Sequence, residues 1–237
     1  MKLLVIIPAY NEESNIDKVI SNLKDNFSNY SDFGYVIIND GSTDNTKELP
    51  DEKKYNHIDL PCNMGLSCAM QLGYKYGYEN NYDCAIQFDG DGQHDINSLP
   101  QLLDPVINGE KDFVVGSRFL HGQSEFKSTI LRRIGISYLS FIIKVFSGCS
   151  VNDPTSGFRA ANRKAIKYLS ANYPVDYPEP ESLVDLSRHS FRIGEVQVNM
   201  LEREGGISSI SSWKSVYYMI KVSLAIICSS LQRKVGD

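Results

Sequence analysis

The segment that most constrains the fold is a short apolar run, residues 85–88, which ends abruptly in Asp-Gly-Asp-Gly-Gln at positions 89–93. Such a run is typical of a buried strand, and the polar residues then emerge at its carboxyl end, where open α/β sheets bind their ligands. The oxygens of Asp89, Asp91 and Gln93 suit a hard divalent cation such as Mg²⁺ or Mn²⁺, which would hold a diphosphate. Alone, this motif is equally typical of a polar turn, so the neighbouring segments must decide between a turn and a cation site.

Strand–loop–helix units precede this segment. Apolar strands at 3–7 and 35–38 each run into a polar loop and then into a helical pattern, and residues 63–67 open a third helix. Gly41 permits the turn after the second strand, and Ser42 beside it can cap the following helix. The alternation predicts an α/β fold with a mostly parallel sheet. The sequence has no GxGxxG motif and no phosphate-loop lysine motif, which disfavours hydride transfer and phosphate-loop ATPase activity.

The composition fits one folded domain that does not bind nucleic acid. With 237 residues, 42% of them hydrophobic, the chain can bury a full core. Its formal net charge of −5 disfavours nucleic acid as the main partner. Five scattered cysteines without a CxxC pair predict reduced thiols rather than a zinc site or a disulfide framework. Because a strand follows directly after Met1-Lys2, we expect no signal peptide and a cytoplasmic protein.

Two apolar stretches in the second half have basic residues near both ends. Residues 134–143 lie between Arg133 and Lys144, and residues 222–231 follow Lys221. Each has ten residues, whereas a membrane-spanning helix needs about 20. They are therefore predicted to be amphipathic helices that lie in the membrane interface. The alternative is a pair of core or oligomer helices.

Seven short motifs, in order along the chain, resemble those of a known family. They are Pro8-Ala-Tyr-Asn-Glu12, Asn39-Asp40-Gly-Ser-Thr-Asp44, Asn63-x-Gly65, Asp89-Gly-Asp91-Gly-Gln93, Gly116-Ser-Arg118, Asp153-Pro-Thr-Ser-Gly-Phe-Arg159 and Glu202-Arg203-Glu-Gly-Gly206-x-Ser208. The set is similar to the family 2 glycosyltransferases. Its second half resembles the dolichol-phosphate mannose synthase branch, which includes bacterial enzymes that load a sugar onto polyprenyl phosphate. Each motif alone is weak, but the resemblance covers residues 3–234.

The resemblance implies an α/β fold of the GT-A type: a Rossmann-like, mostly parallel sheet flanked by helices, with C-terminal amphipathic interfacial helices. We expect one domain over residues 1–237. Residues 1–118 would form its nucleotide-sugar-binding half, 119–210 its acceptor half and 211–237 the C-terminal amphipathic helix.

On the donor side, the resemblance implies roles for individual residues. Pro8, Tyr10, Glu12 and Asp40 would hold the base and ribose of a UDP- or GDP-linked sugar. The nucleotide-sugar site would also include Asp89, Gly90 and Asp91. The metal, Mg²⁺ or Mn²⁺, would be held by Asp89, Asp91 and Gln93 and would offset charge on the departing diphosphate. His94 and Asp95 would either support these residues or begin the next helix, where Asp95 suits the N-cap.

On the acceptor side, a lipid phosphate is already ionised at neutral pH and needs no general base. It needs cations, preferably arginines, whose planar fork matches phosphate oxygens. Arg133 and Ser137 share one helix face at i and i+4 and would contact the acceptor phosphate, together with Arg118 and Arg203, which the resemblance adds. Arg159 would contribute or be structural. For this reaction we expect Asp91, Arg133 and Arg203 to be catalytic.

Three departures from the family pattern leave alternatives open. Asn39 stands where many members have a second aspartate, so Asp40 alone would serve the base. The lysine that often follows the position of Arg203 in the family is missing here; either Lys214 takes its place or no residue does. Residues 177–181, Tyr-Pro-Glu-Pro-Glu, fall where hydroxyl-acceptor members carry an acidic pair, so Glu181 could be a catalytic base. The prolines predict a rigid loop there.

The residues thus favour a metal-dependent, inverting glycosyltransferase that uses polyprenyl phosphate at the cytoplasmic membrane face. The expected partners are a nucleotide sugar, polyprenyl phosphate, the membrane surface and, since no span is predicted, a small integral membrane protein. The alternatives are transfer to a hydroxyl of a growing cell-surface polysaccharide, with Glu181 as base, and a catalytically idle membrane-docked subunit.

Overall fold

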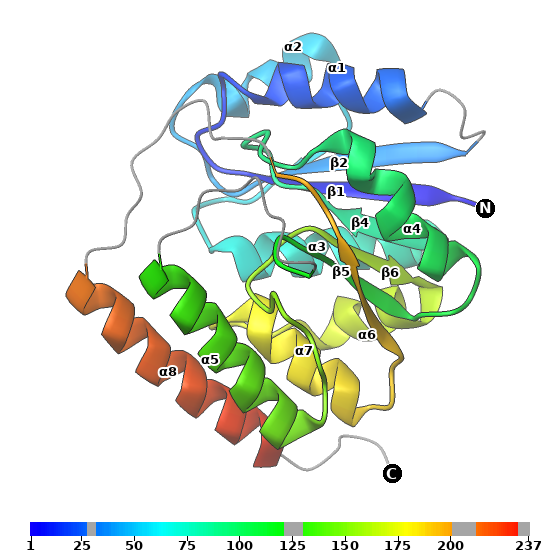
Figure 1. The fold of residues 1–237 in the computed structure, drawn as a ribbon. Helices are drawn as coiled ribbons and strands as arrows, with labels where there is room; N and C mark the ends of the chain where they lie inside the picture. Colours follow the sequence, from blue (N-terminus) through cyan, green and yellow to red (C-terminus); the bar gives the residue numbers. More distant parts are fainter. Residues whose placement is uncertain (28–31, 121–129, 201–211, 232–237) are drawn as a thin grey trace.

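The fold is a central seven-stranded sheet covered by helices on both faces (Figure 1). The computed structural model describes residues 1–27, 32–120, 130–200 and 212–231. The strand order is β3-β2-β1-β4-β6-β5-β7, and β6 runs antiparallel to both of its neighbours while all other pairs are parallel. The strands are β1 (Leu3–Ala9), β2 (Phe33–Asn39), β3 (His57–Asp59), β4 (Cys84–Gln87), β5 (Phe113–Ser117), β6 (Arg159–Asn162) and β7 (Ile193–Gln197). The predicted α/β class is confirmed.

Strand β1 is buried along its whole length because both sheet faces are covered. Leu3, Val5 and Ile7 point into one hydrophobic core and are fully buried, while Leu4 and Ile6 point into the other. An unbroken apolar run is the pattern expected for a central parallel strand. The apolar runs at 3–7, 35–38 and 85–88 therefore correspond to β1, β2 and β4, whereas the short edge strand β3 had no such signal.

The helices form two unequal covers. Helix α1 lines the core on one face and α4 packs against β5 and β6, while α3, α6 and α7 cover the other face (Figure 1). Two further helices, α5 and α8, lie side by side outside α7. The α-helices are α1 (Ile16–Phe27), α2 (Leu49–Lys53), α3 (Leu66–Glu79), α4 (Leu99–Ile107), α5 (Ile130–Ser147), α6 (Arg163–Asn172), α7 (Pro178–Arg188) and α8 (Ser212–Leu231). The 3₁₀ helices are η1 (Asn45–Lys47) and η2 (Ile96–Ser98).

Helices α5 and α8 each present one apolar face to the body and another to solvent. On α5, Ile136, Leu139 and Ile143 are buried, whereas Ile134 and Phe141 are 60% and 62% exposed. The exposed apolar residues on the two helices are Leu131, Ile134, Tyr138, Phe141, Val145, Phe146, Tyr217, Tyr218, Ile220, Leu224 and Leu231. Among the residues that the structure describes, no helix combines the length and apolar content that a membrane crossing requires.

The prediction of a rigid loop at residues 177–181 was wrong. Pro178 and Pro180 instead lie in the first turn of α7. Proline is tolerated there because the first backbone N–H groups of a helix have no intrahelical acceptor, and its fixed φ already suits the helix. The intervening loop between α6 and α7 is shorter than the sequence suggested.

A carboxylate clip joins the starts of β5 and β7. The buried Asp112 accepts hydrogen bonds from the Arg192 backbone N–H (2.8 Å) and from its guanidinium Nη2 (2.9 Å). Asn162 Nδ2, at the end of β6, donates to the same carboxylate at 2.9 Å. These bonds, led by the Arg192 side chain, lower the pKa of Asp112 to about 2. The clip lies at the end of β5 opposite to Arg118.

We predict that Asp112 makes stability dependent on pH in the acid range. Its folded pKa lies below that of the unfolded chain, so its contribution is complete above about pH 4 and is lost as the pH falls towards 2. Asp112→Asn should lower the free energy of unfolding by about 1–3 kcal/mol at pH 7 and flatten this dependence. Urea unfolding at several pH values measures both, with Asp104→Asn, an exposed carboxylate on α4, as the control. An unchanged pH dependence in Asp112→Asn would contradict the assignment.

Candidate active site

A cleft of about 310 Å³ opens where β1, β2 and β4 end. All seven residues predicted to bind the nucleotide sugar line it, and they come from three separate loops. Its lining residues are Pro8, Ala9, Tyr10, Glu12, Asp40, Asn63, Gly65, Leu66, Ala69, Asp89, Gly90 and Asp91. The volume is at the lower end of the range of ligand sites. Other lining residues were not predicted individually. Asn63 and Gly65 belong to a motif identified from the sequence, whereas the pattern around Leu66 and Ala69 predicted only a helix.

Two of these loops are held together by reciprocal side-chain bonds. Asn11 donates its backbone N–H to Ser42 Oγ at 3.0 Å, and its own Oδ1 accepts from the Thr43 N–H at 2.9 Å. The Glu12 N–H donates to Thr46 Oγ1 at 2.8 Å. Asn11 has a φ of 56°, a left-handed conformation that asparagine tolerates better than most residues. The loops after β1 and β2 therefore form one rigid wall of the cleft.

Asp40 orders the third loop. One carboxylate oxygen accepts from the Met64 N–H at 2.7 Å and the other from the Gly65 N–H at 2.9 Å. Gly41 follows with a φ of 65°, and a Cβ there would lie 2.3 Å from the Cys62 carbonyl carbon, so only glycine fits this approach. Asp40 thus faces the cleft and supports its rim at once. Its predicted contact with the base stays a prediction.

The asparagine at position 39 has a structural reason. Its Nδ2 donates to Asp59 Oδ1 at 2.7 Å, while its Oδ1 accepts from the Ser42 N–H at 3.1 Å. An aspartate at this buried position would bring a second carboxylate against Asp59, which is costly without a cation. The departure from the family pattern is therefore matched to its neighbour on β3.

Asp89 lies in a pocket that keeps it ionised. Burial alone would raise its pKa, but His94, Gln87 and Arg159 outweigh burial, and the pKa of Asp89 is lowered. His94 Nε2 is 3.0 Å from Asp89 Oδ2, and the imidazole stacks on Phe158 with ring centroids 4.6 Å apart. Of the two alternatives for His94, the structure therefore supports contact with the motif.

Gly157 makes room for this carboxylate from the opposite side. A Cβ at Gly157 would lie 3.0 Å from Asp89 Oδ2 and 3.2 Å from Gln87 Nε2. Asp95, by contrast, caps η2, since its Oδ1 accepts from the Asn97 N–H at 3.0 Å. It therefore begins the next helical segment, as the second alternative proposed.

The donor set fits a divalent cation bound mainly through a substrate. Asp89 and Asp91 both line the cleft, and Asp91 Oδ1 accepts from the Gln93 N–H at 3.0 Å, which fixes the turn between them. Within the described parts of the chain, no group of three or more His, Cys, Asp or Glu side chains could hold a metal ion. Mg²⁺ commonly takes only one or two carboxylates and completes its shell with water and substrate phosphates. The carboxylates of Asp89 and Asp91 at the cleft meet that requirement.

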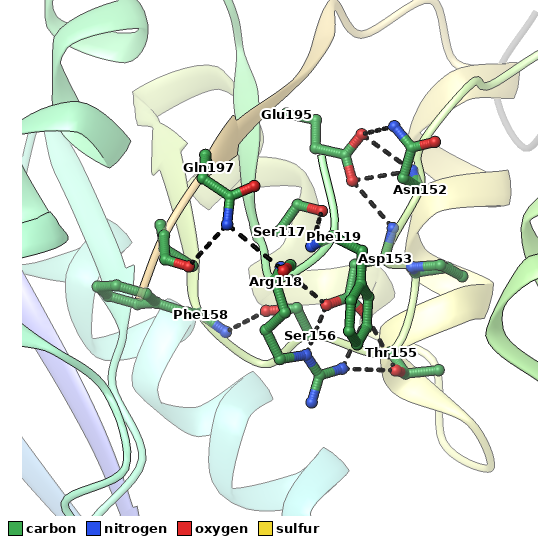
Figure 2. Close-up of polar contacts among 12 residues, drawn as sticks. Ser117, Arg118, Phe119, Asn152, Asp153, Thr155, Ser156, Phe158, Glu195 and Gln197 are labelled. Atoms are coloured by element: carbon green, nitrogen blue, oxygen red, sulfur yellow. Dashed lines mark hydrogen bonds and ion pairs between the residues drawn. The ribbon is translucent and has the colours of Figure 1, made fainter. Parts of the chain in front are cut away.

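Arg118 is held in a buried ion pair at the end of β5 (Figure 2). Asp153 accepts from Arg118 Nε at 2.6 Å and from Nη2 at 2.7 Å, and Thr155 Oγ1 accepts from the same Nη2 at 2.9 Å. Arg118 is 4% exposed and Asp153 is fully buried. Bidentate pairing of this kind fixes both the position and the plane of the guanidinium. Arg118 is therefore placed by Asp153.

The other predicted acceptor residues lie on α5 or outside the described residues. The guanidinium carbons of Arg133 and Arg118 each lie 5.4 Å from the centre of the Phe119 ring. The pKa of Arg132 is lowered, first by burial and second by the like charge of Arg118 nearby. Ser137 is exposed on α5. Arg203 and the side chain of Lys214 lie outside the part of the chain that the structure describes.

Glu181 is engaged at the start of α7. Its Oε1 accepts from the Tyr177 backbone N–H at 2.8 Å, which closes the first turn in the manner of a helix cap. Burial raises its pKa. Burial also raises the pKa of Glu179, and the charges of Arg159 and Asp89 act on this carboxyl. Arg159 itself is buried and structural, since it donates to three backbone carbonyls and to Ser182 Oγ.

The sequence matches a known family over most of its length. The pattern described as "Glycosyl transferase family 2" covers residues 4–169. A UDP-N-acetylglucosamine–dolichyl-phosphate N-acetylglucosaminyltransferase of Methanococcus voltae is 36% identical over 222 residues, covering 85% of this chain and 86% of the relative. A polyprenol monophosphomannose synthase of Mycolicibacterium smegmatis is 27% identical over 249 residues, covering 99% and 91%.

Solved structures share the fold at low sequence identity. Glucosyl-3-phosphoglycerate synthase of Mycobacterium tuberculosis, in complex with Mn²⁺, UDP and phosphoglyceric acid, superposes with a TM-score of 0.70. The two are 19% identical, and the match covers 99% of this chain and 80% of the other. The structural neighbours are GT-A glycosyltransferases, so the predicted fold type is confirmed. By its sequence pattern and its relatives, the chain belongs to the family 2 glycosyltransferases.

Proposed function

We propose that this glycosyltransferase moves a sugar from a UDP-linked donor to a polyprenyl phosphate, with a divalent cation and with inversion at the anomeric carbon. The observation that carries the proposal is helix α5, which bears arginines at its start and an exposed apolar stripe along its length. An anion-binding end joined to a lipid-compatible face suits an acceptor that is itself a phosphate on a long hydrocarbon.

The donor side is supported by the cleft and by the relatives. The carboxylates of Asp89 and Asp91 line the cleft, where they would hold a cation that neutralises the leaving diphosphate, and the pKa of Asp89 is lowered by its neighbours. The M. voltae relative is named for UDP-N-acetylglucosamine, and the solved neighbour was crystallised with Mn²⁺ and UDP. A UDP-linked N-acetylglucosamine or glucose is therefore the donor that we propose.

The transfer itself needs no base from this chain. A phosphate oxygen of the acceptor attacks the anomeric carbon as its bond to the diphosphate oxygen breaks, so the diphosphate departs from the opposite face. The acceptor is ionised beforehand, and Arg133, with Arg118 beside it, would orient it. Arg203 remains a predicted contributor to the same site. The protein's role is positioning and charge compensation.

The exposed apolar faces of α5 and α8 support a peripheral position on a membrane, and we propose that it is the inner face. Ile134 and Phe141 on α5, and Ile220 and Leu224 on α8, are each more than half exposed. Ser223 of α8 lies 3.2 Å from the Tyr138 hydroxyl of α5, which joins the two helices into one surface. A small integral membrane partner stays a prediction from the sequence.

Asp91→Asn should abolish transfer without unfolding the protein. Loss of one carboxylate weakens binding of the cation that stabilises the departing diphosphate, so kcat should fall by at least about 100-fold. A lipid-extraction assay with radiolabelled UDP-sugars, Mn²⁺ and polyprenyl phosphate measures this, and EDTA should reproduce the loss. Asp95→Asn is the matched control, because Asp95 caps η2 and does not line the cleft. Activity retained by Asp91→Asn would remove the metal assignment.

Glu181→Gln separates the two kinds of acceptor. With a lipid phosphate, kcat should stay within about threefold of wild type, whereas loss of a true general base costs about 100-fold or more. The same assay, with circular dichroism to follow α7, gives the answer. A collapse of turnover with donor binding intact would favour a hydroxyl acceptor.

Phe141→Ser should weaken membrane binding and spare the fold. Burying a phenylalanine in lipid stabilises by about 1.5–3 kcal/mol, so the affinity for vesicles should fall about tenfold or more. Co-sedimentation with anionic vesicles measures it. Ile107→Ser, at the end of α4 on the opposite layer, is the control (Figure 1). Equal loss from both variants would argue against a defined membrane face.

A further inference from the structure

The outer strand β7 carries a carboxylate that binds the turn before β6. Glu195, opposite Val115 of β5, accepts from the backbone N–H groups of Asn152 at 2.8 Å and Asp153 at 2.9 Å through Oε1. Its Oε2 accepts from Asn152 Nδ2 at 2.8 Å. One carboxylate thus holds a turn that lies more than 40 residues away in the sequence (Figure 2).

The same turn is tied to helix α5. Ser140 Oγ lies 3.1 Å from the Asn152 carbonyl and equally close to the Ile136 carbonyl of its own helix. When it donates to Asn152, the Asn152–Asp153 peptide is bound at its N–H by Glu195 and at its carbonyl by α5. Asp153 then projects between them and grips Arg118 with both carboxylate oxygens. The turn therefore connects the arginine-bearing helix to the edge of the sheet.

Asp153 is also held by the Arg118 backbone N–H at 3.2 Å and by Thr155 Oγ1 at 3.1 Å, so we expect loss of Glu195 to shift the backbone of the turn rather than to release the Asp153 side chain. Two backbone N–H groups donate to the Glu195 carboxylate, which is the acceptor that the described residues provide for them. Asp153 sets both the position and the plane of the Arg118 guanidinium, and Gln197, two residues along β7, adds a donor 3.4 Å from the Arg118 carbonyl. Because Nε and Nη2 of Arg118 donate to Asp153 and Thr155, this pairing sets which edge of the guanidinium an acceptor phosphate can approach.

We propose that Glu195 is a positioning residue for the acceptor phosphate: it fixes the Asn152–Asp153 turn, and Asp153 in turn aims Arg118. This inference rests on the proposed function, since it assigns Arg118 to the acceptor. Strand β7 does not line the donor cleft, yet through Glu195 it would contribute to the affinity for the acceptor. The effect is expected in KM for the acceptor and not in donor binding.

The test compares Glu195→Gln with Asp112→Asn in the full-length protein. Asp112 is a matched control because it also clips β5 to β7, at the opposite end and away from Arg118. Glu195→Gln should raise the KM for undecaprenyl phosphate about tenfold and weaken binding of farnesyl phosphate by a similar factor, with UDP affinity unchanged. Asp112→Asn should lower the melting temperature at least as much, yet leave both acceptor constants unchanged.

A double-mutant cycle tests the route through Arg118. In an Arg118→Lys background, Glu195→Gln should have little further effect on the acceptor KM, because both changes break the same path. Full additivity, or equal acceptor effects from Glu195→Gln and Asp112→Asn, would overturn the inference. If wild type transfers sugar to the lipid and Glu195→Gln leaves its KM unchanged, only the inference fails. If wild type neither binds farnesyl phosphate nor transfers to any polyprenyl phosphate, the proposed function fails and the inference with it.

Discussion

The parallel pairing of β1 with β2 on one side and β4 on the other determines most of what this molecule can do. These hydrogen bonds bring the carboxyl ends of the three strands to the same edge of the sheet, so the loops that follow the strands meet there. The wholly buried β1 makes the arrangement stiff, because both of its faces contribute to a core. The cleft, which we propose holds a charged donor, thus lies at the end of a wholly apolar strand.

Around that edge, the protein repeatedly uses side chains to hold backbone. Asp40 binds two amides of the next loop, Asn11 joins two loops, and Glu195 holds the turn before Asp153. Each polar group is satisfied by main chain from a distant segment, so the loops are defined without regular secondary structure. Rigid loops of this kind reduce the conformational entropy that a bound substrate would otherwise have to remove.

Sequence patterns predicted the local part of this picture and missed the tertiary part. Apolar runs marked β1, β2 and β4, and all seven residues predicted for the donor do line one cleft. The pattern could not tell that Asp153 would pair with Arg118, because the two are 35 positions apart and meet only through the fold. The prolines of α7 led to the wrong prediction of a loop for a different reason: proline breaks the interior of a helix but suits its first turn. The acceptor arginines stay predictions where no contact tests them.

One strand of the sheet runs against the rest, and this has a consequence for how the chain can be divided. Because β6 enters the sheet from the cleft side, the turn that precedes it lies beside Asp89, and β6 separates β4 from β5. Strand β5 therefore has only later strands, β6 and β7, as neighbours. A fragment cut after residue 118 would carry β5 with no strand to pair with and an open edge at β4. The strands before and after residue 118 alternate in the sheet, so we expect that neither segment can be exchanged between relatives as an independent module.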